Sequence, residues 1–402
     1  MDDIYGNLIT QIADENDKKI VLLVMDGLGD TDNDGKGTSL EIANTPNLDQ
    51  LAQKSALGSS IPVATAIAPG SGPGHLGLFG YDPLIYQVGR GVLSALGVEF
   101  PLEKGDVAAR MNFCTLDQDG KIADRRAGRI PTDENKRVLS KIKENLKVDD
   151  LEVFLETESE HRVVMVLRGN DLDDNIGDTD PQQTGIEPLD PDRKPYDSDT
   201  SRKVKKILAQ IREIIKDEEK ANFMLARGFA KQPDWPEFEE RYKLKPAAVA
   251  GYPMYRGVSR LVGIPVFSQP TSAADICAET VKALRDHTFI FSHFKYTDKT
   301  GEDGDVDKKV AVIEEMDQAL PTLLEGKPDV LIITGDHSTP AAFKAHSWHP
   351  VPLLMHAPLL RGPYLKRFNE KTCLQGEIGR INAKEIIPLA MAHAGKLQKF
   401  GA

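Results

Sequence analysis

Three apolar runs stand out along the chain, at residues 20–25 (IVLLVM), 289–294 (FIFSHF, interrupted by Ser292 and His293) and 330–333 (VLII). Runs without polar alternation are typical of strands that are buried on both faces, as in parallel sheets. An aspartate follows each run, directly or after a few residues: Asp26, Asp298 and Asp336. Because ligands gather beyond the carboxyl ends of strands in open α/β sheets, we expect these three carboxylates to converge.

The middle of the chain has a different texture, with charged helical patterns and arginine-rich turns. Residues 201–220 carry apolar side chains at helical spacing, which predicts a surface helix covering a sheet. Residues 170–200 are polar with four prolines, which predicts a long loop. The sequence therefore predicts an α/β fold with a mostly parallel sheet flanked by helices. Its core domain is discontinuous, at residues 1–104 and 246–402, and a second α/β domain is inserted at residues 105–245.

Composition narrows the class of protein. A chain of 402 residues with 28% charged and 40% hydrophobic residues is long enough for two domains with real cores and is not disordered. A net charge of -12 argues against broad attraction to nucleic acid or to an anionic membrane surface, and no apolar run is long enough to span a bilayer. Cys114, Cys277 and Cys373 show no paired spacing, and the acidic N-terminus lacks the pattern of a secretion signal. We therefore expect a cytoplasmic protein.

The pair Asp336-His337 at the end of the third run is a candidate metal site. Carboxylate oxygen and neutral imidazole suit Zn, Mn and Fe, and His346 and His349 follow in the same short segment. An isolated Asp-His pair has an ordinary alternative, in which Asp336 caps the next helix and His337 forms a local hydrogen bond.

The acids after the other two runs are ambiguous when each is taken alone. Asp26 precedes a glycine, and Asp-Gly is a common turn dipeptide. Asp298 and Glu302 are four residues apart and would face one ion if the segment is helical, whereas a solvated acidic loop is the alternative.

The segment PGSGPGHLGLFGYDP places Ser71 between glycines and ahead of a predicted helix. Backbone N–H groups and the helix dipole favour a phosphate or an oxyanion at such a position, although Ser71 could also simply cap the helix. A serine hydroxyl becomes a good nucleophile when a divalent metal lowers its pKa. The segment has no Gly-x-Ser-x-Gly elbow, and the chain has no P-loop. We expect His75 to hydrogen-bond locally rather than bind a metal.

Taken together, these motifs resemble the archaeal-type cofactor-independent phosphoglycerate mutases of the alkaline phosphatase superfamily. The resemblance covers nearly the whole chain. It is carried by IVLLVMDGLGD, NTPNLDQLA, PGSGPGHLGLFGYDP, YQVGRGVLSALGVEF, DVAARMNFCTLD, DRRAGRI, HRVVMVLRG, DTDP, FKYTDKTGEDGD, ITGDHSTP and HSWHPVPLL.

The resemblance implies an alkaline-phosphatase-like core with an inserted lid domain, two divalent metal ions and a phosphoserine intermediate on Ser71. Mn²⁺ is the expected metal, with Mg²⁺, Co²⁺ and Zn²⁺ as alternatives, and no bisphosphoglycerate is needed. The implied ligands of one metal are Asp26, Ser71, Asp336 and His337, and those of the other include Asp298 and His346. The third ligand of the second metal is usually histidine, whereas this chain has Glu302, with His349 as a possible substitute.

In such enzymes the inserted domain binds the glycerate, and arginine suits carboxylate and phosphate because its guanidinium binds both in bidentate fashion. Each candidate could instead form a surface ion pair. The candidates are Arg126, Arg129, Arg162, Arg227, Arg256 and Arg260. Asp124 and Asp180 are equal candidates for a proton shuttle on the substrate hydroxyl.

The resemblance implies the interconversion of 3-phosphoglycerate and 2-phosphoglycerate in glycolysis and gluconeogenesis. The small-molecule substrate is the only partner we expect, and the oligomeric state stays open. One alternative is a metal-dependent phosphomonoesterase, or a phosphotransferase acting on another small metabolite such as homoserine. A non-catalytic binding protein, in which Glu302 marks a lost metal, is a further alternative.

Overall fold

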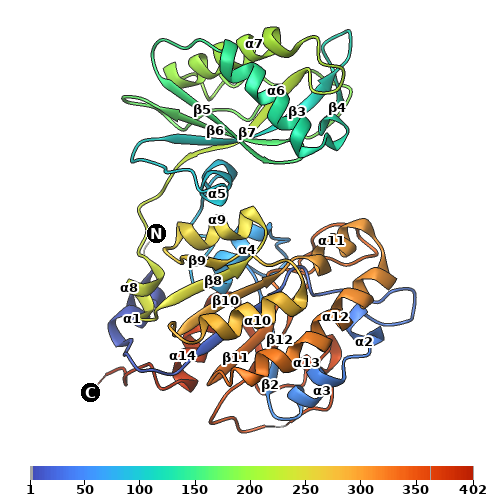
Figure 1. The fold of residues 1–402 in the computed structure, drawn as a ribbon. Coiled ribbons are helices and arrows are strands. Elements are labelled where there is room, and N and C mark those ends of the chain that lie inside the picture. Colours follow the sequence, from blue (N-terminus) through green and yellow to red (C-terminus); the bar gives the residue numbers. More distant parts are fainter. Residues whose placement is uncertain (1–2, 363, 402) are drawn as a thin grey trace. The chain divides into compact units, whose positions relative to one another are not determined.

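The computed structural model describes residues 3–362 and 364–401, and the chain divides into two compact units (Figure 1). Unit 1 comprises Met1–Gln87 and Trp235–Ala402, and unit 2 comprises Val88–Asp234. The sequence predicted domain boundaries at 104/105 and 245/246. In the structure, residues 88–104 belong to unit 2 and residues 235–245 belong to unit 1. Helix α5 (Arg90–Gly97) packs on the unit 2 sheet, whereas Phe238 packs against Phe79 and Phe289 of unit 1.

The sheet of unit 1 is mostly parallel. In order across the sheet its strands are β13 (Gly379–Asn382), β2 (Ala56–Ile61), β12 (Val351–His356), β11 (Val330–Thr334), β1 (Ile20–Met25), β10 (Phe289–Phe294), β8 (Pro246–Ala250) and β9 (Val266–Ser268). Among the described strands of this sheet, the two pairings of β12 are antiparallel and the other pairings are parallel. The three apolar runs are β1, β10 and β11, and they are adjacent and parallel to one another. The α/β class and the mostly parallel sheet predicted from the sequence are confirmed.

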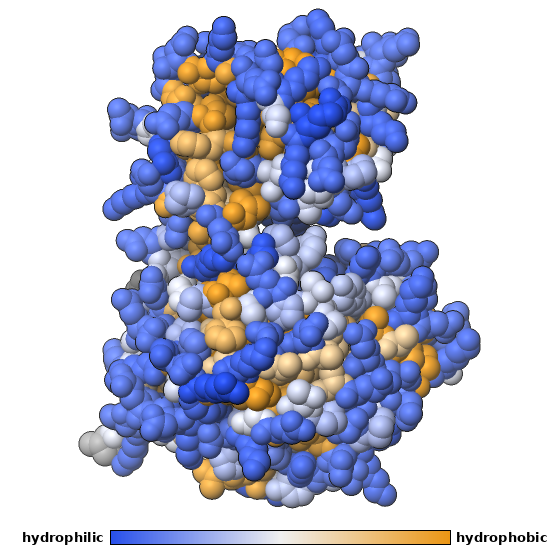
Figure 2. All heavy atoms as spheres, in the orientation of Figure 1, coloured by the Kyte–Doolittle hydropathy of each residue, from blue (hydrophilic) through white to orange (hydrophobic). Residues whose placement is uncertain are grey.

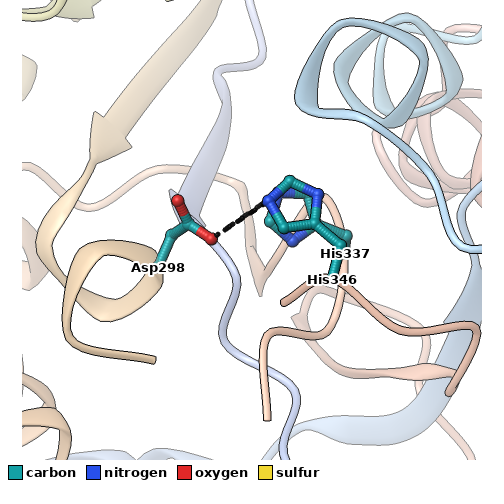
Figure 3. A group of neighbouring side chains, drawn as sticks. All are labelled: Asp298, His337 and His346. Carbon is teal, nitrogen blue, oxygen red and sulfur yellow. Dashed lines mark ion pairs between the residues drawn. The ribbon is translucent and has the colours of Figure 1, made fainter. Parts of the chain in front are cut away.

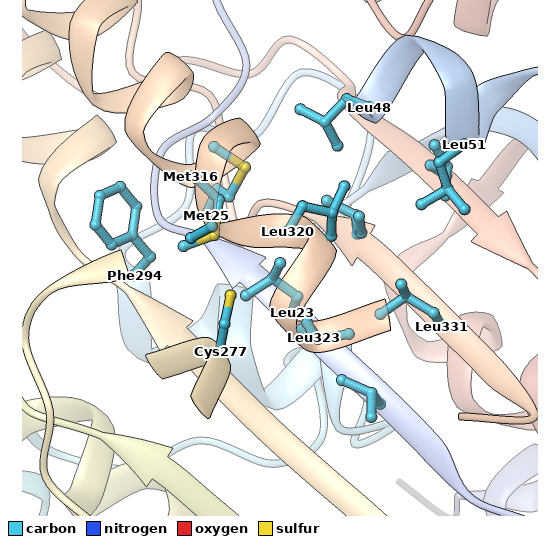
Figure 4. Packing of buried hydrophobic residues seen from close by; sticks show 14 of the residues in the cluster. Leu23, Met25, Leu48, Leu51, Cys277, Phe294, Met316, Leu320, Leu323 and Leu331 are labelled. Carbon is cyan, nitrogen blue, oxygen red and sulfur yellow. The ribbon is translucent and has the colours of Figure 1, made fainter. Parts of the chain in front are cut away.

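Helices cover both faces of this sheet. They are α1 (Ile4–Ile12), α2 (Ser39–Ile42), α3 (Pro46–Ala52), α4 (Ser71–Leu78), α8 (Phe238–Tyr242), α9 (Pro253–Leu261), α10 (Ala273–Ala283), α11 (Tyr296–Asp303), α12 (Val306–Glu325), α13 (Glu370–Cys373) and α14 (Ile386–His393), with a 3₁₀ turn at Ala383–Glu385. On one face, α3, α10 and α12 pack over β1, β10 and β11, where Leu23, Met25, Phe294 and Leu320 are buried together (Figure 4). On the other face, α4 packs against β10 through Phe79 and Phe291.

Unit 2 has an antiparallel sheet of its own. The strand order is β4 (Ile122–Asp124), β3 (Val107–Leu116), β6 (Arg162–Arg168), β5 (Glu152–Ser159), with β7 (Phe223–Lys231) also paired to β3. Helices α6 (Thr132–Asn145) and α7 (Asp199–Ile215) cover one face of the sheet. The predicted surface helix is α7, which begins at a capping box formed by Ser198 and Ser201. The preceding residues 170–198 form the predicted loop, without helix or strand.

The chain enters and leaves unit 2 at neighbouring points. On the unit 1 side, the rings of Tyr86 and Trp235 meet edge to face at a centroid separation of 5.3 Å. On the unit 2 side, a Cβ on Gly89 would lie 2.7 Å from the carbonyl oxygen of Gly228, so only glycine allows this approach. Gly228 itself has a φ of 66°, a backbone conformation that favours glycine.

Hydrophilic residues dominate the face of each unit that is drawn in Figure 2, with smaller apolar patches between them. Among the described residues, no helix combines the length and the apolar character needed to cross a membrane.

Candidate functional site: an acid–histidine cluster beside Ser71

Three neighbouring strands deliver the candidate ligands to one edge of the unit 1 sheet. Asp26 follows β1, Asp336 follows β11 by two residues, and β10 leads into α11, which carries Asp298. All three carboxylates are buried, at 0%, 0% and 1% exposure. The three aspartates therefore lie together at the carboxyl ends of neighbouring strands, as the sequence predicted.

The inner subsite, which we define as Asp26, Asp336 and His337 with Ser71, gathers around one ring nitrogen. His337 Nε2 lies 3.2 Å from Asp336 Oδ2 and 3.4 Å from Asp26 Oδ1. Ser71 Oγ lies 3.3 Å from the same nitrogen. The four groups expected to bind one metal are therefore neighbours.

Ser71 is the first residue of α4, and Gly70 is the N-cap. Its side chain therefore does not cap the helix, which was the alternative interpretation of this position. Its hydroxyl instead points at His337. The N-terminus of a helix favours negative charge, so phosphoryl oxygens held near Ser71 would lie at an electrostatically suitable place.

The outer subsite, which we define as Asp298, His346 and Glu302, lies beside the inner one. His346 Nε2 is 3.4 Å from Asp298 Oδ1, and the rings of His337 and His346 stack at 3.6 Å (Figure 3). His346 Nδ1 lies 2.8 Å from the carbonyl oxygen of Pro69 and donates to it, so Nε2 is left for a ligand. Asp298, His337 and His346 form one group with metal-binding spacing, and Asp26, Asp336 and His337 form another.

Glu302 and His349 differ in their relation to the outer subsite. Residues 296–303 are helical, as the spacing of Asp298 and Glu302 required, and Glu302 Oε1 lies 3.8 Å from His346 Nε2. The Glu302 side chain is 55% exposed. His349 stacks on Trp348 and contacts Ser347 Oγ through Nδ1, and it belongs to neither group of converging ligand atoms in the described chain.

A second layer of polar residues holds the carboxylates of the inner subsite. His293 Nε2 lies 3.1 Å from Asp26 Oδ2, and His75 Nδ1 lies 3.1 Å from Asp336 Oδ2. The His75 nitrogen also lies 2.8 Å from the carbonyl oxygen of Ser71, which agrees with the local hydrogen bond expected for His75. Lys295 donates to Asp26, Asp298 and the hydroxyl of Tyr255. Sequence reasoning missed His293 and Lys295, although a histidine inside the apolar run FSHF was a usable signal.

Burial and neighbouring charges shift the pKa values of this cluster in opposite directions. Burial raises the pKa of Asp26, but Lys295 and His293 outweigh it and hold that pKa well below its usual range. Burial lowers the pKa of His293 to about 4, so this ring is neutral and its Nε2–H donates to Asp26. Burial also lowers the pKa of His346, but Asp298 outweighs it and raises this pKa to about 9.

The donor set fits divalent cations. Asp26 Oδ1 and Asp336 Oδ2 are buried carboxylate oxygens without a hydrogen bond from the described residues, because the His75 Nδ1 that lies 3.1 Å from Asp336 Oδ2 donates to the Ser71 carbonyl oxygen instead. Leaving such atoms unsatisfied costs free energy, and a cation held between them and His337 Nε2 would satisfy both. Carboxylate oxygen with imidazole nitrogen suits Mn²⁺ and Zn²⁺.

The arginine candidates fall in two units. Burial lowers the pKa of His161 in unit 2 to about 3, and the charges of Arg162, Arg110, Arg126 and Arg129 act in the same direction. Arg227, also in unit 2, is half-buried, and burial and the charge of Arg90 lower its pKa. In unit 1, α9 carries Arg256 and Arg260. All six arginines remain candidates for substrate binding.

The two proton-shuttle candidates already have local partners. Asp180 accepts a bidentate pair from Arg125, at 2.9 and 2.7 Å. Asp124 accepts from the backbone N–H groups of Arg126 and Gly128. Sequence reasoning missed Arg125, which lies beside the chosen Arg126.

Comparisons with known proteins give a consistent answer. A family model described as 2,3-bisphosphoglycerate-independent phosphoglycerate mutase matches residues 52–221. A probable 2,3-bisphosphoglycerate-independent phosphoglycerate mutase of Thermus thermophilus is 50% identical, over 98% of this chain and 99% of the relative. One from Aquifex aeolicus is 47% identical, over 98% of this chain and 100% of the relative.

Solved structures agree. A Pyrococcus horikoshii protein superposes with a TM-score of 0.82 at 30% identity, covering 96% of this chain and 99% of that one. The cofactor-independent phosphoglycerate mutase of Thermoplasma acidophilum gives a TM-score of 0.69 at 31% identity, with 94% and 100% covered.

The fold and the site define an α/β protein that presents a serine and two acid–histidine subsites at the carboxyl edge of a mostly parallel sheet. The near-complete coverage by relatives at 47–50% identity makes the assignment specific. The chain belongs to the 2,3-bisphosphoglycerate-independent phosphoglycerate mutase family.

Proposed function

We propose that this protein interconverts 3-phosphoglycerate and 2-phosphoglycerate without bisphosphoglycerate, with Ser71 as the phosphoryl acceptor. The observation that carries the proposal is the position of Ser71 Oγ, 3.3 Å from His337 Nε2 at the N-terminus of α4. A nucleophile in this position lies among groups that can stabilise charge on the transferring phosphoryl oxygens.

We propose two divalent cations, Mn²⁺ in the first place. Asp26, Ser71, Asp336 and His337 would hold one, and Asp298, His346 and Glu302 would hold the other. Such cations lower the pKa of a bound hydroxyl and neutralise charge on attacking and leaving oxygens. The unsatisfied oxygens of Asp26 and Asp336 support this assignment.

The reaction is a balanced exchange of ester bonds. The Ser71 hydroxyl gives up its proton and the Oγ–P bond forms as the bond between phosphorus and one glycerate oxygen breaks, and that oxygen takes up a proton. The glycerate then turns, and its other hydroxyl loses a proton and attacks phosphorus. The Ser71 Oγ–P bond breaks, and Oγ takes up a proton again. Water must be kept away from the phosphoserine throughout, because hydrolysis would convert the mutase into a phosphatase.

We assign the binding of the glycerate carboxylate and of the phosphate to arginines of the candidate set: Arg126, Arg129, Arg162, Arg227, Arg256 and Arg260. The positive charge near His161 supports the first three, because the guanidinium groups of Arg162, Arg110, Arg126 and Arg129 add to the effect of burial in lowering the pKa of this histidine. Bidentate guanidinium binding would fix the orientation of a small substrate that carries a carboxylate and a phosphate. We also place the enzyme in the cytoplasm, because its three cysteines are free and buried.

The direct test is an enolase-coupled assay of metal-loaded protein with 3-phosphoglycerate and no bisphosphoglycerate. Formation of phosphoenolpyruvate supports the mutase. Release of inorganic phosphate without phosphoenolpyruvate would reject it in favour of a phosphomonoesterase. An assay with homoserine and a phosphoryl donor, run in parallel, tests the phosphotransferase alternative.

A further inference from the structure

The hydroxyl of Thr339 contacts one ligand of each subsite. Thr339 Oγ1 lies 2.7 Å from Asp298 Oδ1 in the outer subsite and 3.0 Å from His337 Nδ1 in the inner one. The Thr339 side chain is fully buried. The two hydrogen bonds therefore link the subsites through a single atom, away from solvent.

Hydrogen-bond chemistry fixes the direction of both contacts. His337 Nε2 faces Asp336, Asp26 and Ser71, and a ring nitrogen that binds a cation there must offer its lone pair. The proton of the neutral ring then sits on Nδ1 and is donated to Thr339 Oγ1. The hydroxyl has one proton of its own, and the Asp298 carboxylate can only accept. The chain of bonds runs from His337 through Thr339 to Asp298.

The backbone of Thr339 is fixed from both sides. Its N–H donates to the carbonyl oxygen of Gly29 at 3.0 Å, and its carbonyl oxygen accepts from the buried ammonium of Lys309 at 2.8 Å. Gly27 packs against the hydroxyl so closely that a Cβ there would lie 2.5 Å from Thr339 Oγ1. The hydroxyl is thus preorganised for its two partners.

We propose that Thr339 is a positioning residue that couples the two cation subsites. It sets the His337 tautomer that the inner subsite needs, and it orients Asp298 for the outer subsite. This role rests on the proposed function, because it presumes that both subsites bind cations. Groups that hydrogen-bond to metal ligands change metal affinity by roughly 10- to 100-fold when they are removed.

The test is a titration of the metal-free protein with Mn²⁺ by isothermal calorimetry. Thr339→Val keeps the shape of the side chain and removes the hydroxyl, and we expect it to weaken both binding events by about tenfold or more. Thr339→Ser keeps the hydroxyl and should restore both affinities. Thr339→Ala removes the hydroxyl without placing a methyl beside Gly27. This variant replaces Thr339→Val in the titration if the valine variant folds poorly.

Thr334→Val is the matched control. Thr334 is another fully buried threonine, on β11, and its hydroxyl donates to the carbonyl oxygen of Pro352 at 2.8 Å. We expect this variant to lose thermal stability and to keep both Mn²⁺ affinities. A wild-type protein that binds no Mn²⁺ would count against the proposed function itself. A wild type that binds two ions, with hydroxyl-free variants that weaken neither event or only one, would overturn the coupling role and leave the function standing.

Discussion

The inner and outer subsites use the same ligand chemistry in different surroundings. Asp26, Asp336 and His337 are fully buried, whereas the side chains of His346 and Glu302 are 22% and 55% exposed. Each inner carboxylate is held by at least one further group, His293 and Lys295 for Asp26 and the N–H of Gly27 for Asp336. The inner carboxylates are therefore held by hydrogen bonds in a buried position, whereas the Glu302 side chain of the outer subsite is largely exposed to solvent.

This difference indicates at which positions of the two subsites a substitution can be tolerated. Replacing a buried candidate ligand by a side chain that cannot accept the same hydrogen bonds leaves the donors unpaired in a low-dielectric interior, which is costly. Replacing a half-exposed ligand leaves room for water to take its place. Glu302, the residue that departs from the ligand pattern implied by the family resemblance, is at the half-exposed position.

The largest expected effect comes from Ser71→Ala, which removes the proposed nucleophile of the inner subsite. We expect mutase activity to fall at least about 1,000-fold and the phosphoprotein mass shift to disappear. Intact-protein mass spectrometry after substrate addition measures the shift. Ser60→Ala is a matched control, since Ser60 is buried and its hydroxyl contacts no hydrogen-bond partner. A Ser71→Ala enzyme with substantial turnover would remove Ser71 from its role.

Asp336→Asn tests whether the inner carboxylates serve to bind a cation or to stabilise the fold. We expect Mn²⁺ affinity of the inner subsite to fall by about 100-fold or more, because a charged ligand is lost. In the metal-free protein the same change should be neutral or stabilising, because it relieves repulsion with Asp26. Calorimetry and thermal unfolding with chelator measure the two effects. A strong loss of metal-free stability would mean that Asp336 is chiefly structural.

Metal removal should lower stability through the buried subsite. A ligand present at 100 times its dissociation constant stabilises the folded state by about 2.7 kcal/mol. We therefore expect a chelator to lower the melting temperature of the wild-type protein clearly, and that of Asp336→Asn much less. Equal shifts in the two proteins would contradict the inner subsite as the main source of this stabilisation.

The pH dependence of Mn²⁺ binding should distinguish the outer subsite from the inner one. The pKa of His346 is raised to about 9 in the metal-free protein, so at neutral pH a cation must displace a proton from this ring. Mn²⁺ affinity of the outer subsite should therefore rise with pH and level off above about pH 9. In the metal-free protein the His346–Asp298 pair contributes stability below the unfolded pKa near 6.5, and this contribution is lost as pH rises through about 9. Calorimetry in buffers of different ionisation enthalpy counts the released proton, and release of none would contradict the prediction.

The smallest effects should come from Glu302 and His349. We expect Glu302→Ala to weaken outer-subsite Mn²⁺ binding by about tenfold, because this half-exposed ligand can be replaced by water. His349→Ala should leave the metal content unchanged, because its ring stacks on Trp348 instead of joining either subsite. Metal analysis of both variants decides which residue completes the outer subsite.

The sequence predicted most of the cluster because strand ends are local features. Each of β1, β10 and β11 is an apolar run that leads to its aspartate within the same segment, so the carboxyl-edge rule could be applied directly. The supporting residues could not be found in this way. Thr339 and Lys295 act through contacts with Asp298 and Asp26, and these contacts exist only after distant segments have packed.

The two chain crossings between the units, marked by Tyr86 with Trp235 and by Gly89 with Gly228, carry a consequence for the history of the gene. All strands formed by residues 88–234 belong to the unit 2 sheet, so the unit 1 sheet is built without them. A lineage could gain, lengthen or exchange residues 88–234 without reordering a strand that leads to a candidate metal ligand. Selection on the candidate arginines of unit 2 and selection on the proposed chemistry of Ser71 can then proceed in separate stretches of the same reading frame.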